Sequence, residues 1–208
     1  MIRQKRWFPV VYMFAATAFF SSIVIGLTQS TSERVAANEK LTFEKAVLAV
    51  LPGLYDENDK VAGLELHKRF TEKVTAPDEL SGGAYTLRES GKIAAYALPL
   101  SGRGFWAPIK GIIGIEADKK TITAIAIYQQ NETPGLGAEI ARPEFRSQFK
   151  GKVMLMGEKP LSIARPGAQL DQSSVHAVTG ATQTSTRLEV IINNGLSEWQ
   201  QKLPRGSQ

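Results

Sequence analysis

Apolar positions dominate the beginning of the chain. Twenty residues without a charge run from Phe8 to Leu27, close to the roughly 20 that an α-helix needs to cross a bilayer core of about 30 Å. A cleaved signal peptide is the alternative, but its apolar region typically has about 7–15 residues and is followed closely by a small-residue cleavage site. Here the polar sequence TQSTSER follows. The pattern therefore favours a retained transmembrane helix over residues 8–27.

The charges on either side of this span predict its orientation. Arg3, Lys5 and Arg6 precede it, and the first charge after it is Glu33. Because cytoplasmic segments carry the excess of Lys and Arg, residues 1–7 are expected in the cytoplasm. The sequence predicts a single-pass protein of the cell inner membrane whose C-terminal domain is extracytoplasmic (periplasmic).

The pattern changes after the apolar span. Residues 28–40 are polar and predict a short tether, residues 41–203 a folded domain and residues 204–208 a tail. Thr42 is expected to cap a helix whose apolar residues recur at helical spacing, and Pro52-Gly53 to end it.

Within the folded domain, alternating segments bounded by turn residues predict two β-hairpins. Their strands are residues 84–89 with 93–100, and residues 109–116 with 122–129. A short helix is expected to start at Pro143 and stop at Gly151. Residues 153–156 and 161–164 are expected to form two further short strands.

The last element has the clearest helical period. Its apolar residues share one face, and Thr184 or Ser185 is expected to cap it; they are Leu188, Ile191, Ile192, Leu196, Trp199 and Leu203. Together the elements predict an α+β domain, an antiparallel sheet with flanking helices, preceded by one transmembrane helix.

Composition excludes several classes of function. The absence of Cys excludes disulfides, thiolate zinc sites and iron–sulfur clusters, and with only two His no metal site is predicted. Arg3, Lys5 and Arg6 supply three of the net +5 charges, so the remainder does not indicate nucleic-acid binding. Redox chemistry would need a bound cofactor.

Two loops of small residues are candidates for the chemistry. In 131-NETPGLGAE-139, Gly135 and Gly137 permit positive φ and close approach of backbone to a ligand, although an ordinary turn also fits. In 178-VTGATQTS-185, Gly and hydroxyl residues precede a helix N-terminus that suits a phosphate, although a Ser/Thr-capped helix start also fits.

Taken together the loops are more specific. Glu132-Thr133-Pro134-Gly135-Leu136-Gly137 followed by Thr179-Gly180-Ala181-Thr182 resembles the covalent-FMN domain of two proteins: the C subunit of sodium-translocating NADH:quinone reductase (Nqr) and the G subunit of the Rnf complex. The segments 102-GRGFW-106, 123–140 and 143–152 extend the resemblance over most of residues 84–200.

The resemblance implies that Thr182 carries FMN through a phosphoester, installed after export by a flavin transferase that consumes FAD with a divalent cation. It implies that Thr179, Gly180 and Ala181 cradle the phosphate. Four residues are expected to border the flavin and Arg165 to supply a basic group; the four are Glu132, Thr133, Leu136 and Gly137. No catalytic side chain and no metal ligand are assigned. By dipole alone, Thr184 would serve the phosphate about as well as Thr182.

The function implied is an electron-transfer subunit of an Nqr/Rnf-type ion-translocating complex, with the other membrane subunits as partners. A non-flavinylated binding or assembly subunit, or a stand-alone exported FMN-binding redox protein, are the alternatives. One departure supports the first of these: the family usually has Asp where this chain has His176, and Asp171 is too far upstream to replace it. His176 is otherwise expected to be an exposed loop residue without a role.

Overall fold

The computed structural model describes residues 7–56 and 61–204. The chain divides between Lys40 and Leu41 into two compact units, which are described separately. The predicted cytoplasmic segment apart from Trp7, and the predicted tail apart from Pro204, lie outside the described residues.

The helix α1 is assigned over Phe8–Val50; its residues up to Lys40 belong to the first unit and its last ten to the second. Among the described residues it is the one helix long and apolar enough to cross a membrane. Its apolar side chains are exposed, as at Phe14 and Phe20, which is what a lipid-facing helix requires.

Residues 28–40, predicted to form a tether, are helical, and Thr42 lies inside α1 rather than at a cap. The hydroxyl groups explain the difference. Ser30 and Thr31 donate to the backbone carbonyl of Leu27 at 3.0 and 2.9 Å. Such bonds to the preceding turn satisfy polar side chains within a helix, so a polar run does not end it.

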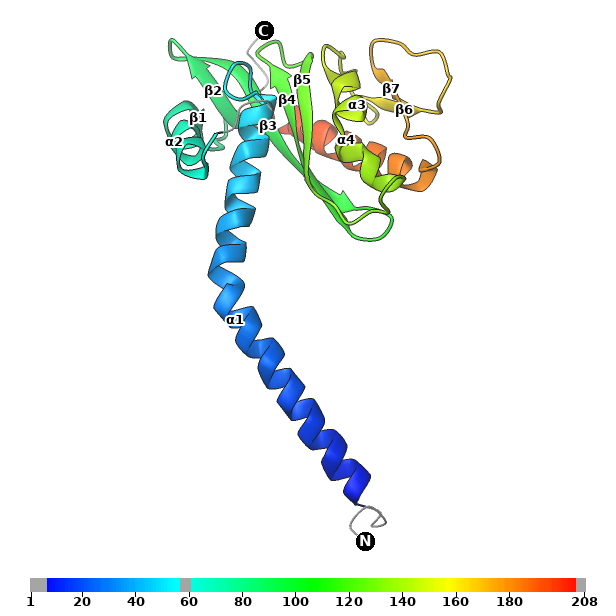
Figure 1. Cartoon of the computed structure of the whole chain (residues 1–208). Helices are drawn as coiled ribbons and strands as arrows, with labels where there is room; N and C mark the ends of the chain where they lie inside the picture. Colours follow the sequence, from blue (N-terminus) through cyan, green and yellow to red (C-terminus); the bar gives the residue numbers. More distant parts are fainter. Residues whose placement is uncertain (1–6, 57–60, 205–208) are drawn as a thin grey trace. The chain divides into compact units, whose positions relative to one another are not determined.

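The second unit is built on a five-stranded antiparallel sheet in which each strand pairs with its neighbours in the sequence (Figure 1). The two predicted hairpins are confirmed as β2–β3 and β4–β5, and the long strands β3 and β4 also pair with each other. The strands are β1 Val74–Thr75, β2 Tyr85–Glu89, β3 Lys92–Arg103, β4 Pro108–Glu116 and β5 Ile122–Gln129.

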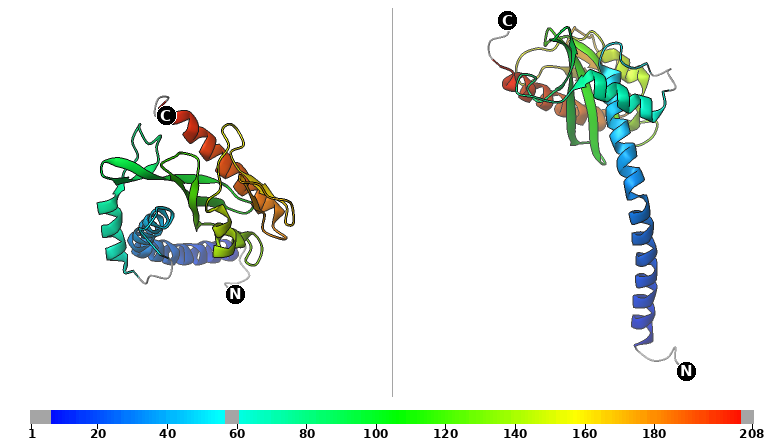
Figure 2. Two further views of the ribbon diagram at one scale, coloured as in Figure 1. Left: turned by 90° about the horizontal axis from the view of Figure 1, so that it is seen from above. Right: turned by 90° about the vertical axis from the view of Figure 1, so that its left-hand side faces the viewer.

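Helices cover both faces of this sheet (Figure 2). Along β3, Tyr96 and Leu98 face a core completed by the C-terminal helix α4 (Thr182–Lys202), while Ala95 and Ala97 face the last turns of α1. This alternation follows the two-residue period of a strand. The predicted antiparallel α+β class is thereby confirmed, with flanking helices on two faces.

Three short elements connect β5 to the rest of the domain. They are the 3₁₀ helix η2 (Gly137–Ala141), the helix α3 (Pro143–Arg146) and the 3₁₀ helix η3 (Ser147–Phe149). The helix predicted to start at Pro143 is confirmed, and Gly151 follows it with a φ of +76°.

The remaining small elements differ from the prediction. Residues 153–156 form no strand and make one isolated bridge, between Val153 and Thr121. The predicted strand at 161–164 is β6 (Ser162–Ala164), and it pairs in parallel with β7 (Ser174–His176), which the sequence did not predict. The helix α2 (Gly63–Lys73) was missed because only Leu66 on it is buried.

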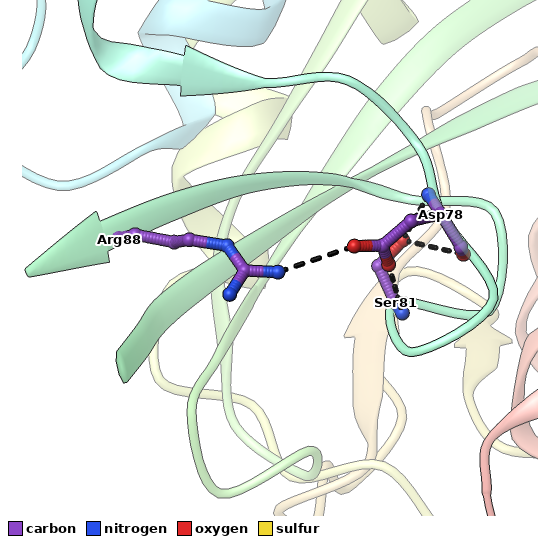
Figure 3. A network of polar contacts seen from close by, with 3 residues as sticks. All are labelled: Asp78, Ser81 and Arg88. Atoms are coloured by element: carbon purple, nitrogen blue, oxygen red, sulfur yellow. Dashed lines mark hydrogen bonds and ion pairs between the residues drawn. The ribbon is translucent and has the colours of Figure 1, made fainter. Parts of the chain in front are cut away.

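The loop before β2 is hydrogen-bonded to α4 and also within itself; Figure 3 shows the contacts among Asp78, Ser81 and Arg88. Trp199 of α4 is buried and donates its indole N–H to the Ser81 carbonyl at 2.8 Å. Asp78 accepts from the Ser81 backbone N–H at 2.7 Å and from Arg88 at 3.2 Å. The bond from the Ser81 backbone and the positive charge of Arg88 hold the pKa of Asp78 below its usual value.

Candidate functional site

Three segments that are distant in the sequence line one pocket of about 380 Å³. The turn between β3 and β4 contributes two aromatic residues, the segment after β5 four residues, and the start of α4 five residues. They are Phe105 and Trp106; Glu132, Thr133, Leu136 and Gly137; and Gly180, Ala181, Thr182, Gln183 and Thr184. The volume lies within the usual range of small-molecule sites, about 300–1,000 Å³.

The segment after β5 is a tight turn closed by the Thr133 carbonyl, which accepts the backbone N–H groups of Leu136 and Ala138, both at 3.1 Å. Gly135 has a φ of +73°, as predicted. The same prediction is wrong for Gly137, whose φ lies outside the left-handed region. There, packing excludes a side chain: a Cβ would stand 2.5 Å from the Oγ1 of Thr184.

The start of α4 is held by its own backbone and by one buried hydroxyl. Gly180 has a φ of +77°, Ala181 donates its N–H to the Val178 carbonyl at 3.1 Å, and the Oγ of Ser185 accepts the Val178 N–H at 3.2 Å. The helix begins at Thr182 with Ala181 as its N-cap, so the predicted caps Thr184 and Ser185 are wrong. The first N–H groups of a helix have no partner within it, and the dipole there favours an anion.

The hydroxyl groups in the first turn of α4 differ in exposure. Thr184 is 4% exposed and donates to the Oε2 of Glu132 at 2.8 Å, and Ser185 is 2% exposed. Thr182 is exposed and lines the pocket. Of these three hydroxyl groups, Thr182 therefore offers the one that a group in the pocket can reach.

The turn between β3 and β4 presents its aromatic side chains outward. Phe105 is 43% and Trp106 68% exposed, and their rings meet edge to face with centroids 4.9 Å apart. Leu136 on the opposite loop is 44% exposed. Both aromatics stand within GRGFW, but the sequence did not assign them to the site. The available signal was two large aromatic residues in a Gly-rich turn, where a hairpin does not need them.

Seven of the nine predicted site residues line this pocket, and Thr179 and Arg165 do not. Both of these are exposed; Thr179 directly precedes Gly180, and Arg165 directly follows β6. Among the described residues no group of His, Asp and Glu is placed to hold a metal ion.

The expectation of an exposed loop histidine at position 176 is wrong. His176 ends β7 and is partly buried, its backbone N–H donates to the Oε1 of Gln148 at 2.8 Å, and its Nδ1 is buried without a hydrogen-bond partner. Asp171 is engaged in its own turn, where hydroxyl and backbone donors of Ser174 and Ser173 hold the pKa of its carboxyl below the usual value. Asp171 therefore does not take the place of the Asp that the resemblance predicts at position 176.

Comparison with known proteins links this part of the chain to a cofactor. The family model of the FMN-binding domain matches residues 104–197, which contain the three segments of the pocket and support FMN as the cofactor. The C subunit of the Na⁺-translocating NADH-quinone reductase of Neisseria meningitidis is 35% identical over 130 residues, 61% of this chain and 46% of that protein. The chain resembles this C subunit. The predicted resemblance is thereby confirmed, and the chain spans about half the length of that relative.

Other C subunits of this reductase give the same result. That of Chlamydia pneumoniae is 36% identical over 110 residues, which are 51% of this chain and 34% of that protein. The crystal structure of the C subunit from Parabacteroides distasonis matches with a TM-score of 0.70 and 26% identity, over 85% of this chain and 98% of that one. The likeness thus extends from the sequence to the arrangement of the elements.

The residues present fit the two ends of an FMN molecule. Gly180, with its positive φ, would bring a Cβ within 3.2 Å of Leu136, so a bare backbone lies at the start of α4 where a phosphate needs donors. Exposed apolar surface from Phe105, Trp106 and Leu136 lies across the same pocket. A planar ring system requires such surface.

Proposed function

We propose that this chain is the FMN-carrying, electron-transferring subunit of a sodium-translocating NADH:quinone reductase, with the FMN phosphate esterified to the hydroxyl of Thr182. The observation that carries the proposal is the difference in exposure between the hydroxyl groups at the start of α4. Thr182 is exposed in the pocket, whereas the Thr184 hydroxyl is buried against Glu132. The likeness to the C subunits supports the rest.

Attachment requires a flavin transferase and FAD. The Oγ of Thr182 attacks the FMN phosphorus of FAD, the bond from that phosphorus to the bridging oxygen of the pyrophosphate breaks, and AMP leaves. The hydroxyl proton passes to solvent, and no electrons are transferred. The product is a phosphodiester with one negative charge, which the positive end of the α4 dipole stabilises by roughly 0.3–1 kcal/mol.

Once attached, the group is held by this chain's backbone and apolar side chains. The N–H groups of the first turn of α4 would hold the phosphate, and Thr133, Leu136 and Gly137 would border the ring. FMN supplies transfer of one or two electrons, so no side chain needs to act as acid or base. Thr179 as part of the cradle and Arg165 as its basic partner stay predictions, since neither lines the pocket.

The membrane arrangement completes the proposal. Residues 8–27 of α1 cross the inner membrane with residues 1–7 in the cytoplasm, and the domain of residues 41–203 lies in the periplasm. Two observations support this arrangement. The surface of α1 is apolar and exposed, and the similar proteins are subunits of Na⁺-translocating reductases. The partners are the other membrane subunits of the complex.

The test is co-expression of the full chain with its own flavin transferase, followed by intact-protein mass and in-gel flavin fluorescence. Wild type should gain the mass of one FMN less one water, and Thr182→Val should gain none while remaining folded. Thr186→Val is the matched control, because Thr186 is an exposed hydroxyl one turn further along α4; it should keep the flavin.

Two outcomes would overturn the proposal. Flavin retained in Thr182→Val would refute the attachment site. Wild type that stays unmodified would refute the flavoprotein function and favour a non-flavinylated assembly subunit, which His176 in place of the family's Asp already suggests as the second candidate.

A further inference from the structure

One buried carboxylate connects all three segments of the pocket. Glu132 is 5% exposed and lies in the segment after β5. Its Oε1 accepts the backbone N–H groups of Phe105 at 2.9 Å and Trp106 at 3.1 Å. Its Oε2 accepts the hydroxyl of Thr184 at 2.8 Å. The aromatic turn and the first turn of α4 are thus joined through a single side chain.

Two glycines make room for this carboxylate. A Cβ on Gly104 would stand 2.5 Å from the Oε1 of Glu132, and a Cβ on Gly137 would stand 3.0 Å from its Oε2. Real Cβ atoms essentially never come closer than 3.0 Å to such atoms. Together with the Ala107 carbonyl, 2.6 Å from the Gly104 Cβ position, and the Thr184 hydroxyl, 2.5 Å from that of Gly137, Glu132 leaves no room for a side chain at either glycine.

The aromatic turn joins β3 to β4, which pair up to Arg103 opposite Pro108, but its tip has few other contacts. Phe105 and Trp106 are exposed and contribute no side chain to the core. Apart from the bonds to Glu132, the turn is closed on itself by the Gly104 N–H, which donates to the Ala107 carbonyl at 2.9 Å. Packing fixes buried aromatics, but an exposed pair depends on its backbone for position.

The choice of residue at position 132 also indicates a positioning role. Burying a carboxylate among three uncharged donors is costly compared with an apolar side chain. A carboxylate is nevertheless the side chain that accepts at both oxygens, and bonds to a charged acceptor are shorter and stronger than neutral ones. Such a group suits a junction that has to hold one geometry.

We infer that Glu132 is a positioning residue whose carboxylate fixes the aromatic turn of Phe105 and Trp106 relative to the start of α4, where Thr182 lies. The inference rests on the proposed function in one respect: the ring attached at Thr182 then meets the aromatic pair in a set geometry. Glu132 acts through the turn, and its carboxylate is occupied by protein donors rather than directed to the flavin.

The hydrogen bonds of Glu132 to the aromatic turn and to α4 are tested in flavin-free full-length protein, produced without a transferase. Amide hydrogen exchange is measured at Phe105 and Trp106 in wild type, Glu132→Ala and Glu132→Gln. In the Ala variant both amides lose their acceptor, and exchange at both should accelerate by at least about tenfold. In the Gln variant the amide oxygen can still accept from the turn while its NH₂ group donates to Thr184. Exchange should therefore stay within about threefold of wild type.

Glu139→Ala is the matched control. Glu139 is a carboxylate of the same loop region, paired with Arg142 at 2.8 Å near the surface. Its removal should leave both amides unchanged. Thr184→Val keeps the protein testable if Glu132→Ala fails to fold, because it removes only the α4 bond. Both amides should stay protected in Thr184→Val, since Oε1 still accepts from them.

The link to the flavin is tested in the co-expressed holoprotein by its visible absorption and its reduction potential. Both should shift in Glu132→Ala and in Thr184→Val, return toward wild type in Glu132→Gln, and stay unchanged in Glu139→Ala. Two results would overturn the inference. One is exchange at the wild-type rate at Phe105 and Trp106 in Glu132→Ala; the other is a flavin whose absorption and reduction potential are unchanged in both Glu132→Ala and Thr184→Val. Failure of flavin attachment in wild type would instead refute the proposed function and leave the exchange result to stand.

Discussion

Two neighbouring glycines of the pocket loop are predicted to cost similar stability when replaced by Ala, and to differ in their effect on the flavin. At Gly137 the φ is ordinary, and the cost is steric: the new Cβ would lie 2.5 Å from the Thr184 hydroxyl and 2.9 Å from the Glu132 Cβ. At Gly135 nothing lies within 4 Å of the new Cβ, and the cost is the φ of +73°.

The magnitudes follow from these two mechanisms. Inserting a methyl into a packed site costs about 1–3 kcal/mol, and placing a non-glycine residue in the left-handed region costs about 1–2 kcal/mol. In Gly137→Ala the Thr184 hydroxyl has to move by about 0.5 Å, which disturbs its 2.8 Å bond to Glu132. Gly135→Ala leaves that bond in place.

The assay combines denaturant unfolding of the flavin-free chain with flavin content after co-expression with the transferase. We expect both variants to be destabilised to a similar extent, and only Gly137→Ala to show reduced flavin loading and a shifted flavin spectrum. Gly137→Ala with wild-type stability would refute the steric reasoning. Equal flavin loss in both variants would show that loop stability, rather than contact with Glu132 and Thr184, governs loading.

Three further predictions concern other parts of the chain. Gly114→Ala should destabilise the domain by about 1–3 kcal/mol in urea unfolding, since its Cβ would meet Thr123 and the Val50 backbone, which are hydrogen-bonded to each other. Asp78→Asn should lower the free energy of unfolding at pH 7 by up to about 1 kcal/mol. Because the folded-state pKa of Asp78 is lowered, this difference from wild type should shrink as the pH falls below the ordinary carboxyl pKa of about 4, and a difference that grew with acid would contradict the assignment. Ser30→Cys, which introduces the one thiol in the chain, should react with an impermeant reagent in intact cells after outer-membrane permeabilisation, and reaction only after lysis would reverse the proposed topology.

The elements that the sequence predicted are those with a local cause. The hairpins follow from alternation around Ser90-Gly91 and around residues 117–120, and the structure has positive φ at Ser90, Gly91 and Lys119. The period of α4 identified its buried face. In contrast, the three-residue strand β7 was not predicted, and its pairing with β6 spans a separation that no period reveals.

The site was predictable in part for the same reason. The two loops are visible as local clusters of small residues, but the contacts that join them are not. Glu132 lies 27 residues from Phe105 and 52 from Thr184 along the chain. Nothing in the sequence around Glu132 indicates that its carboxylate faces protein donors. The resemblance placed it beside the flavin, and the structure adds which groups it binds.

The choice between Thr182 and Thr184 depends on where α4 begins, which the sequence misplaced at Thr184 or Ser185 and the structure puts at Thr182. The apolar residues Leu188 and Ile192 define the face of α4 that packs on the sheet. Residues four apart in a helix share a face, so Thr184 belongs to the packed face, whereas Thr182 stands roughly 200° away from it at about 100° per residue. A phosphoester on the packed face would have to be buried with its charge, which is costly. With α4 starting at Thr182, the helical period argues against Thr184 as the proposed attachment site, and its 4% exposure and its bond to Glu132 argue the same way.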